Sequence, residues 1–268
     1  MVMLVAAAQY CASNDIYENQ NIIEKFMLDA GAKNVSLICF PECANLIAKN
    51  KQELKERAEP ANDSKTIKKI RFLARKHKII TSVGSLMLKQ SNQQKIINRG
   101  ILIGRGGELL ATYDKIHMFD ANIGDGKIYS ESDDFNSGNK IVTKKTEVAH
   151  IGFSICYDIR FPQMYRLMSR AGAEIIVTPA AFTAKTGEAH WHVLQRARAI
   201  ENGCFIIAAA QSGIHADGRQ TFGHSLIVNP WGQIIAEAKN HQTELVLAEV
   251  DLKEVEIARN AISAWKSD

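Results

Sequence analysis

Hydrophobic and polar positions alternate along the chain in a way that predicts buried strands separated by amphipathic helices. In the first half, these patterns predict strands at 3–9, 35–40, 79–86, 96–103 and 108–113, with helices at 16–30 and 64–77. In the second half, they predict strands at 148–155, 174–178, 204–210, 224–228, 233–237 and 244–250, with helices at 162–171, 188–202 and from 253 onward. The polar stretch 120–140 has little periodicity and predicts a long loop. This order is typical of an α/β fold, and no break in composition divides it, so we expect one domain over residues 1–268.

The two halves of the chain carry a weak internal echo. Residues 30–32 and 171–173 both read Ala-Gly-Ala and precede a predicted strand, and those strands are followed by Pro41 and Pro179. Two similar halves predict a pseudo-two-fold sandwich of sheets. Because ligands bind at the carboxyl ends of strands in α/β sheets, we expect the functional residues just after these strands.

Composition and charge narrow the possible classes of function. The 33 basic and 29 acidic residues give a net charge of +4, which is too small to indicate a nucleic-acid-binding protein. The basic excess lies in residues 49–78, where apolar residues at helical spacing leave the basic side chains on the opposite face. We interpret this face as solvated, because a nucleic-acid groove would interleave aromatic side chains and only Phe72 is present.

Cysteines and apolar runs indicate an intracellular setting. The chain has five cysteines, an odd number typical of reduced thiols in a cytosol, and no pair has CxxC spacing. No apolar run reaches the ~20 residues of a membrane span. The apolar segment 2–8 has no basic residue before it, so we interpret it as a strand. The sequence therefore predicts a cytoplasmic protein with no membrane partner.

Three residues with suitable chemistry follow predicted strands. Cys156 ends an apolar strand shortly before a predicted helix, where a nucleophile is exposed and the next backbone N–H can face an oxyanion. Glu42 follows a strand and a proline, so partial burial can raise its pKa towards that of a general base. Lys115 closes another strand and can stabilise an oxyanion. Each also has a plainer interpretation: a buried cysteine, a capping carboxylate and a surface lysine.

The segments around these residues together resemble the signatures of one family. Residues 40–42 (Phe-Pro-Glu), 113–117 (Tyr-Asp-Lys-Ile-His) and 155–162 (Ile-Cys-Tyr-Asp-Ile-Arg-Phe-Pro) look like the catalytic segments of the nitrilase superfamily of carbon–nitrogen hydrolases, in the same order. The resemblance continues to residues 229–232 and covers nearly the whole chain. It is greatest to the Nit branch, which includes deaminated-glutathione amidases and ω-amidases. The fold that it implies is a four-layer αββα sandwich of the α/β class.

The resemblance also implies a role for each of these residues. Cys156 would attack an amide carbonyl, Glu42 would act as the general base, and Lys115 with the Tyr157 N–H would hold the oxyanion. Glu131 resembles the second glutamate of the family and would orient Lys115. The plainer interpretation of Glu131 is a solvated acid in the polar loop.

Arg160 is the residue that we expect to bind a carboxylate of the substrate, because the guanidinium fork matches two oxygens. By resemblance, Phe182 and Thr186 would complete that substrate pocket. The alternative for Arg160 is a structural ion pair with a loop acid such as Asp158.

The sequence offers no convincing metal site. His190 and His192 lie two positions apart on a predicted helix, so they point to different faces and make a poor pair of ligands. The resemblance implies neither a metal nor an organic cofactor for the reaction.

These residues favour an amidase that acts on a carboxylate-bearing linear amide, either deaminated glutathione or an α-keto amide, with release of ammonia or an amine. Two alternatives stay open: an N-carbamoyl amidohydrolase of the same superfamily, and a non-catalytic binding protein that keeps the fold. By resemblance, the chain would form a homodimer, or a higher homo-oligomer, through residues 162–171 and the last strands.

Overall fold

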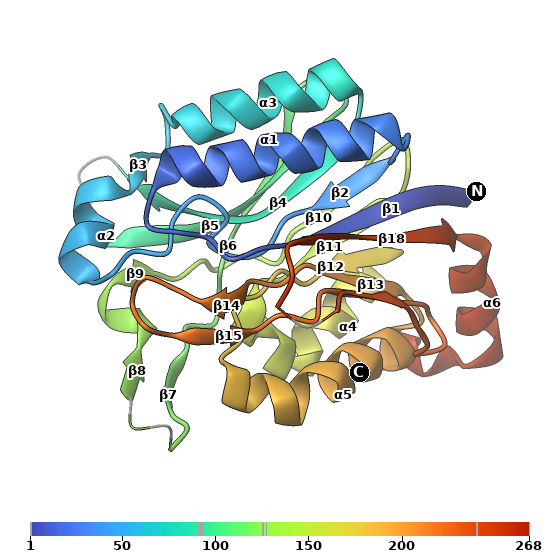
Figure 1. Cartoon of the computed structure of the whole chain (residues 1–268). Coiled ribbons are helices and arrows are strands. Elements are labelled where there is room, and N and C mark those ends of the chain that lie inside the picture. The colour runs from blue at the N-terminus through green and yellow to red at the C-terminus, as the bar shows by residue number, and fades with distance from the viewer. Residues whose placement is uncertain (1, 91–93, 125, 127, 240, 268) are drawn as a thin grey trace.

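Two β-sheets flanked by helices make up the computed structural model, which describes residues 2–90, 94–124, 126, 128–239 and 241–267 (Figure 1). The strands of the first sheet are β1 (Val2–Gln9), β2 (Leu37–Cys39), β4 (Ile80–Lys89), β5 (Ile96–Ile103), β6 (Leu109–Asp114) and β18 (Glu244–Asp251), with the short β3 (Glu59–Pro60) and β9 (Phe135–Asn136) paired to β4 and β5. The order is β18-β1-β2-β4-β5-β6. Strands β1, β2 and β4 run parallel, and their neighbours β18 and β5 run antiparallel to them.

The second sheet repeats this arrangement. Its strands are β10 (Thr143–Lys145), β11 (His150–Phe153), β12 (Ile175–Val177), β13 (Phe205–Ala208), β16 (Leu226–Val228) and β17 (Ile234–Glu237), in the order β10-β11-β12-β13-β16-β17. Strands β11, β12 and β13 run parallel, and β10 and β16 run antiparallel to them. The internal echo in the sequence therefore corresponds to a repeat of topology.

Helices cover the outer face of each sheet. Helices α1 (Ile16–Ala32) and α3 (Lys65–His77) lie together over the first sheet, and α4 (Pro162–Arg170) and α5 (Ala184–Asn202) lie over the second (Figure 1). The chain also forms α2 (Lys51–Arg57), α6 (Lys253–Ala261) and 3₁₀ turns at Glu131–Asp133, Cys156–Arg160 and Ser263–Lys266. The predicted αββα sandwich is confirmed. In the described part of the chain, no helix has the length and apolar character needed to cross a membrane.

Polar and flexible residues at the helix ends explain where the helices begin and end. Ser64 caps α3 by accepting a hydrogen bond from the backbone of the first turn. Gly203 caps the end of α5 in the left-handed conformation. Helix α5 begins one turn earlier than predicted, because the Thr183 side chain accepts from the backbone N–H of Thr186 and caps an additional turn.

The basic segment 49–78 contains two helices, α2 and α3, of which only α3 was predicted. None of the seven residues of α2 is buried, so it has no apolar face to indicate a helix. On α3, Ile70 and Leu73 are buried, which leaves the basic side chains facing outward as expected. One of these, Lys69, pairs with Glu24 of α1 at 2.7 Å.

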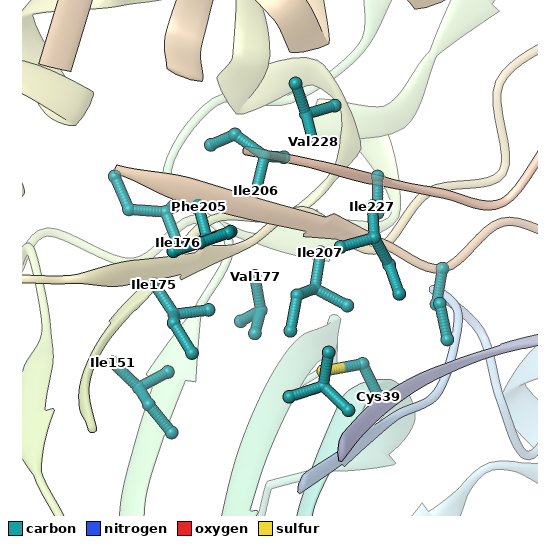
Figure 2. Close-up of a cluster of buried hydrophobic side chains, with 14 of the residues drawn as sticks. Cys39, Ile151, Ile175, Ile176, Val177, Phe205, Ile206, Ile207, Ile227 and Val228 are labelled. Carbon is teal, nitrogen blue, oxygen red and sulfur yellow. The ribbon is translucent and has the colours of Figure 1, made fainter. Parts of the chain in front are cut away.

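An apolar core fills the space between the two sheets. Figure 2 shows Val177 of β12 and Ile207 of β13 beside Cys39 of β2, which belongs to the other sheet. These side chains are buried, and burying a Val or Ile contributes roughly 1.5–3 kcal/mol to stability. One domain over residues 1–268 stays a prediction, and this shared core is what supports it.

The predicted loop 120–140 contains regular structure. Strands β7 (Asp120–Asn122) and β8 (Ile128–Ser130) form an antiparallel hairpin that projects from the sandwich (Figure 1). The loop prediction is wrong here because strands of three residues are too short to show an alternating pattern. The 3₁₀ turn that follows the hairpin begins with Glu131 and returns the chain to β9.

Candidate active site

Cys156 lies where strand β11 passes into a 3₁₀ turn. Its φ is +51°, in the left-handed region, which a non-glycine residue adopts where the surrounding structure imposes it. Its N–H donates to Pro179 O at 2.8 Å, which links the chain after β11 to the chain after β12. The turn therefore holds the thiol at the carboxyl edge of the second sheet, at the strand-to-helix position expected from the sequence.

Asp158 ties this turn to the segment that carries Lys115. Its Oδ2 accepts from Tyr113 Oη at 2.7 Å. Its Oδ1 accepts from the His117 backbone N–H at 3.1 Å and lies 2.7 Å from Nδ1 of the His117 imidazole. Because Tyr113 and His117 flank Lys115, this buried carboxylate fixes the lysine relative to the cysteine. Asp158 and Arg160 both lie in the described part of the chain and form no ion pair with each other.

Glu42 follows β2 and is only 4% exposed. Its Oε1 lies 3.0 Å from Lys115 Nζ and accepts from Asn98 Nδ2 at 2.9 Å. Its Oε2 accepts from the Ala181 N–H at 2.9 Å. The carboxylate also interacts with the Cys156 thiol. Residues of the first half of the chain therefore fix one carboxylate oxygen, and a backbone N–H from the second half fixes the other.

Lys115 sits between two carboxylates and is 2% exposed. Besides its contact with Glu42, its Nζ donates to the two oxygens of Glu131 at 2.9 and 2.8 Å. The Phe119 N–H donates to Glu131 Oε2 at 2.7 Å and holds that carboxylate in place. The β7–β8 hairpin thus brings Glu131 back to the end of β6, where it meets Lys115.

Burial and charge set the protonation states of this cluster. Burial alone would raise the pKa of the Glu42 carboxyl, but Lys115 and several hydrogen bonds hold that pKa below its ordinary value. Burial opposes the charge on Lys115, and the two glutamates nevertheless raise its pKa well above the ordinary value. Burial, then the negative charge of Glu42, raises the pKa of the Cys156 thiol well above its ordinary value. At neutral pH the resting site is therefore a carboxylate, an ammonium and a neutral thiol.

A cavity of about 520 Å³ opens onto this cluster and is also lined by Arg160, Phe182 and Thr186, the residues predicted to bind substrate. The Arg160 guanidinium lies 5.8 Å from the ring centroid of Tyr157 and 5.5 Å from that of Phe182. Its Nη2 is 3.3 Å from His190 Nδ1. Within the described part of the chain Arg160 forms no salt bridge, so its charge remains available in the cavity wall.

Asn98 of β5 is a polar residue of the site that the sequence analysis missed. It is buried, and its Nδ2 lies 2.9 Å from Glu42 Oε1 and 3.4 Å from Glu131 Oε1. It therefore connects the two carboxylates that flank Lys115. A single asparagine within a predicted apolar strand gives no signal of such a role, because the pairing depends on how β5 packs.

Arg219 is a second missed residue. It lies in the turn between β14 (Ser212–Ile214) and β15 (Gln220–Phe222), lines the cavity, and has a buried Nε with no hydrogen-bond partner among the residues that the structure describes. Asp217 Oδ2 is 3.6 Å from that Nε, within ion-pair distance. The Asp217-Gly218 dipeptide is a hairpin signal that could have predicted this turn, although not its place in the cavity.

Among the described residues, one group of three side chains could hold a metal ion. It consists of His192, His224 and Glu237, and none of them lines the cavity. His190, which we discounted together with His192 from the sequence, contacts Arg160, whereas His192 contacts Glu237.

This fold is that of the nitrilase superfamily. The family model for carbon-nitrogen hydrolases matches residues 4–260, and the chain belongs to this family. It is 41% identical over 236 residues to the deaminated glutathione amidase of Yersinia enterocolitica, covering 87% of this chain and 82% of that protein. It is 38% identical over 258 residues to the nitrilase and fragile histidine triad fusion protein of Caenorhabditis elegans, covering 95% of this chain and 58% of that protein.

Solved structures agree with this assignment. The crystal structure of the Caenorhabditis elegans fusion protein matches with a TM-score of 0.93 and 35% identity, over 100% of this chain and 65% of that one. The structure of Saccharomyces cerevisiae Nit3, a member of branch 10 of the superfamily, matches with a TM-score of 0.87 and 29% identity, over 97% and 94%. The chain thus spans less than two thirds of the fusion protein. The family and the Nit-like relatives predicted from sequence are confirmed, and the chain is an enzyme of the carbon–nitrogen hydrolase class.

Proposed function

We propose that this enzyme is an amidase that hydrolyses a carboxylate-bearing linear amide, either deaminated glutathione or an α-keto amide, through a thioester on Cys156. The observation that carries the proposal is the clustering of Glu42, Lys115 and Cys156 in the wall of a cavity that also contains Arg160, which forms no salt bridge among the described residues. The deaminated glutathione amidase of Yersinia enterocolitica, at 41% identity, supports the same substrate class.

Acylation begins with attack by Cys156 Sγ on the amide carbonyl carbon. The thiol is neutral at rest and Glu42 is ionised, so Glu42 takes the thiol proton as the new C–S bond forms. Lys115 Nζ and the Tyr157 N–H stabilise the oxyanion. When the intermediate collapses, the C–N bond breaks, Glu42 gives its proton to the leaving nitrogen, and ammonia or an amine departs.

Hydrolysis of the thioester uses the same groups in reverse order. Glu42 takes a proton from a water molecule, whose oxygen attacks the thioester carbonyl. The C–S bond then breaks, the sulfur regains its proton from Glu42, and a carboxylic acid is released. Glu131 contributes by holding the Lys115 ammonium in place and charged throughout.

Two guanidinium groups would recognise the rest of the substrate. Arg160 would pair with one carboxylate, and the flanking rings of Tyr157 and Phe182 would exclude water and strengthen that pair. Thr186 lines the same wall. The Nε of Arg219, which has no hydrogen-bond partner among the described residues although Asp217 lies 3.6 Å away, suits a second anionic group. A cavity of about 520 Å³ is also larger than a simple amide needs, which favours an elongated substrate with two acid groups.

The proposal is tested by measuring ammonia and amine release from a panel containing deaminated glutathione, α-keto acid amides and N-carbamoyl amino acids. We expect turnover of the first two and a thioester adduct on Cys156 in a quenched reaction analysed by mass spectrometry. Cys156→Ala should abolish turnover and leave the thermal unfolding midpoint nearly unchanged. Cys43→Ala is the matched control, because Cys43 is the other thiol that lines the cavity and it should remain dispensable.

Each alternative has its own outcome in the same experiment. Faster release from N-carbamoyl amino acids would replace the amidase assignment with an amidohydrolase of that class. Binding of the acids without turnover of any amide would indicate a non-catalytic binding protein. Normal activity in Cys156→Ala would remove the thioester mechanism.

The assembly and location of the enzyme are part of the proposal. A homodimer through α4 is supported by Leu167, which points an apolar side chain outward from that helix. A cytoplasmic location is supported by five cysteines that are all free thiols.

A further inference from the structure

Three side chains outside the cavity converge on one point between helix α5 and strand β17. His192 Nε2 and His224 Nδ1 each lie 2.7 Å from the same oxygen, Glu237 Oε1. All three ligand atoms are within 4.8 Å of one another. The three residues come from a helix, a turn and a strand, so the convergence depends on the tertiary fold.

The two imidazoles are held by the surrounding structure. Phe222 stacks on the His224 ring, with centroids 4.4 Å apart, and meets the His192 ring edge-on at 5.8 Å. The backbone of His224 has a φ of +55°, and its carbonyl accepts from Nε1 of the fully buried Trp191, the neighbour of His192 on α5. The rings therefore need little rearrangement to bind a common partner.

The ligand set matches the preferences of divalent transition ions. Neutral imidazole nitrogens and a carboxylate oxygen bind zinc at about 2.0–2.2 Å. Both nitrogens already aim at one point, and the Glu237 side chain is partly exposed, so its oxygen can move aside to become the third ligand. The three side chains are 25–32% exposed, which leaves coordination positions for water.

We infer that His192, His224 and Glu237 form a binding site for a divalent transition-metal ion of the zinc class. Each neutral imidazole would bind the ion through the lone pair of the nitrogen that now faces Glu237 and would carry its N–H proton on the other ring nitrogen, so that no proton is lost to solvent. A bound ion would link α5 to the β16–β17 hairpin. Helix α5 also carries Thr186, which lines the cavity. The inference does not depend on the proposed amidase function.

The test is calorimetric titration of metal-free protein with Zn²⁺, paired with Co²⁺ titration followed by absorption. We expect one equivalent to bind, and Co²⁺ to give weak visible bands typical of nitrogen and oxygen ligands. His192→Ala and His224→Asn should each weaken binding by at least about tenfold, because even outer-sphere partners of metal ligands are worth 10–100-fold. Asparagine is chosen at His224 because it tolerates the left-handed backbone, and circular dichroism checks that both variants fold.

Two controls separate this site from other ligands. His241→Ala removes an exposed histidine elsewhere and should leave binding unchanged. Cys156→Ala should also leave it unchanged, since the cavity thiol is not a ligand of this site. The inference is overturned by absence of binding, by full affinity in a folded His192→Ala, by loss of binding in Cys156→Ala, or by the intense near-ultraviolet band of a cobalt–thiolate bond.

Discussion

At the scale of single residues, the site is governed by a lysine that burial would neutralise and two carboxylates that keep it charged. Among the described residues, the Lys115 Nζ has three contacts within hydrogen-bond distance, all with carboxylate oxygens. A buried charge without partners would cost several kcal/mol. The two carboxylates therefore keep Lys115 charged. We expect the ammonium to stabilise the negative charge that develops on the substrate oxygen during the reaction.

Replacing Lys115 with alanine should lower kcat by at least ~10²-fold, the scale of one lost oxyanion donor. KM should change much less, because the interaction strengthens only in the transition state. Steady-state kinetics on a good amide substrate measures the split. A rise in KM with unchanged kcat would make Lys115 a binding residue instead.

The ionised state of Glu42 predicts an acid limb in the pH profile. Because the pKa of its carboxyl is held below the ordinary value of 4.5, kcat/KM should fall towards acid pH with a midpoint below pH 4.5. The stability that comes from this lowered pKa is likewise present above 4.5 and lost as the pH falls through the folded value. Glu42→Gln should be inactive at every pH. An acid limb with its midpoint at or above pH 4.5 would contradict the assignment.

Arg160 should determine the preference for acid-bearing amides. Leaving a buried charged hydrogen bond unpaired costs roughly 2–5 kcal/mol, so an amide with a free carboxylate should exceed its methyl ester by ~10²–10³ in kcat/KM. Arg160→Ala should abolish that ratio, and Arg160→Lys should restore only part of it, because an ammonium lacks the planar fork. If the alanine variant keeps the full ratio, the carboxylate binds elsewhere.

Substrates with one and with two carboxylates distinguish the role of Arg219 from that of Arg160. With a substrate that has two carboxylates, Arg219→Gln should raise KM, whereas with a one-carboxylate amide it should have little effect. Arg160→Ala should impair both substrates. Equal effects of Arg219→Gln on the two would leave Arg219 without a role in recognition.

At the scale of elements, Asp158 joins the turn after β11 to the end of β6. Asp158→Asn replaces one carboxylate oxygen with an N–H donor, which leaves the Tyr113 hydroxyl or the His117 N–H without an acceptor. We expect the free energy of unfolding in urea to fall by about 1–3 kcal/mol and kcat to fall because Lys115 shifts. Asp114→Asn is the control: its pair with Arg99 is partly exposed, so its loss should cost less than about 1 kcal/mol.

The elements that the sequence predicted correctly are those with long apolar periodicity, such as β1 and α1. Those that it missed include α2, the hairpins β7–β8 and β14–β15, and the strands β3, β9 and β10, all of which are short or lack a buried face. Glu42, Lys115 and Cys156 were found because each follows a strand and matches a family segment. Asn98 and Arg219 were not, because their place in the site depends on contacts between elements distant in sequence.

At the scale of the whole molecule, the site exists only where the two halves of the sandwich meet. The first half supplies Glu42 and Lys115, and the second supplies Cys156. The two halves are also joined beside Glu42: Tyr10 and Gln211 form a β-bridge, and Gln211 Nε2 donates to Glu42 O at 2.9 Å. The repeated topology therefore brings strand ends from both sheets to one cavity, as the internal echo predicted.

If the enzyme is a homodimer through α4, a single charged side chain introduced on that helix should separate the protomers. Leu167 on α4 is 50% exposed, and Phe72 on α3, on the opposite outer layer, is 53% exposed. Stable interfaces bury about 1,200–2,000 Å² with an apolar centre. A lysine placed there must be desolvated without a partner, which costs several kcal/mol. Light scattering of Leu167→Lys should therefore report a monomer, and Phe72→Lys should keep the wild-type mass. A monomeric wild-type chain, or an unchanged dimer in Leu167→Lys, would place the interface elsewhere or remove it.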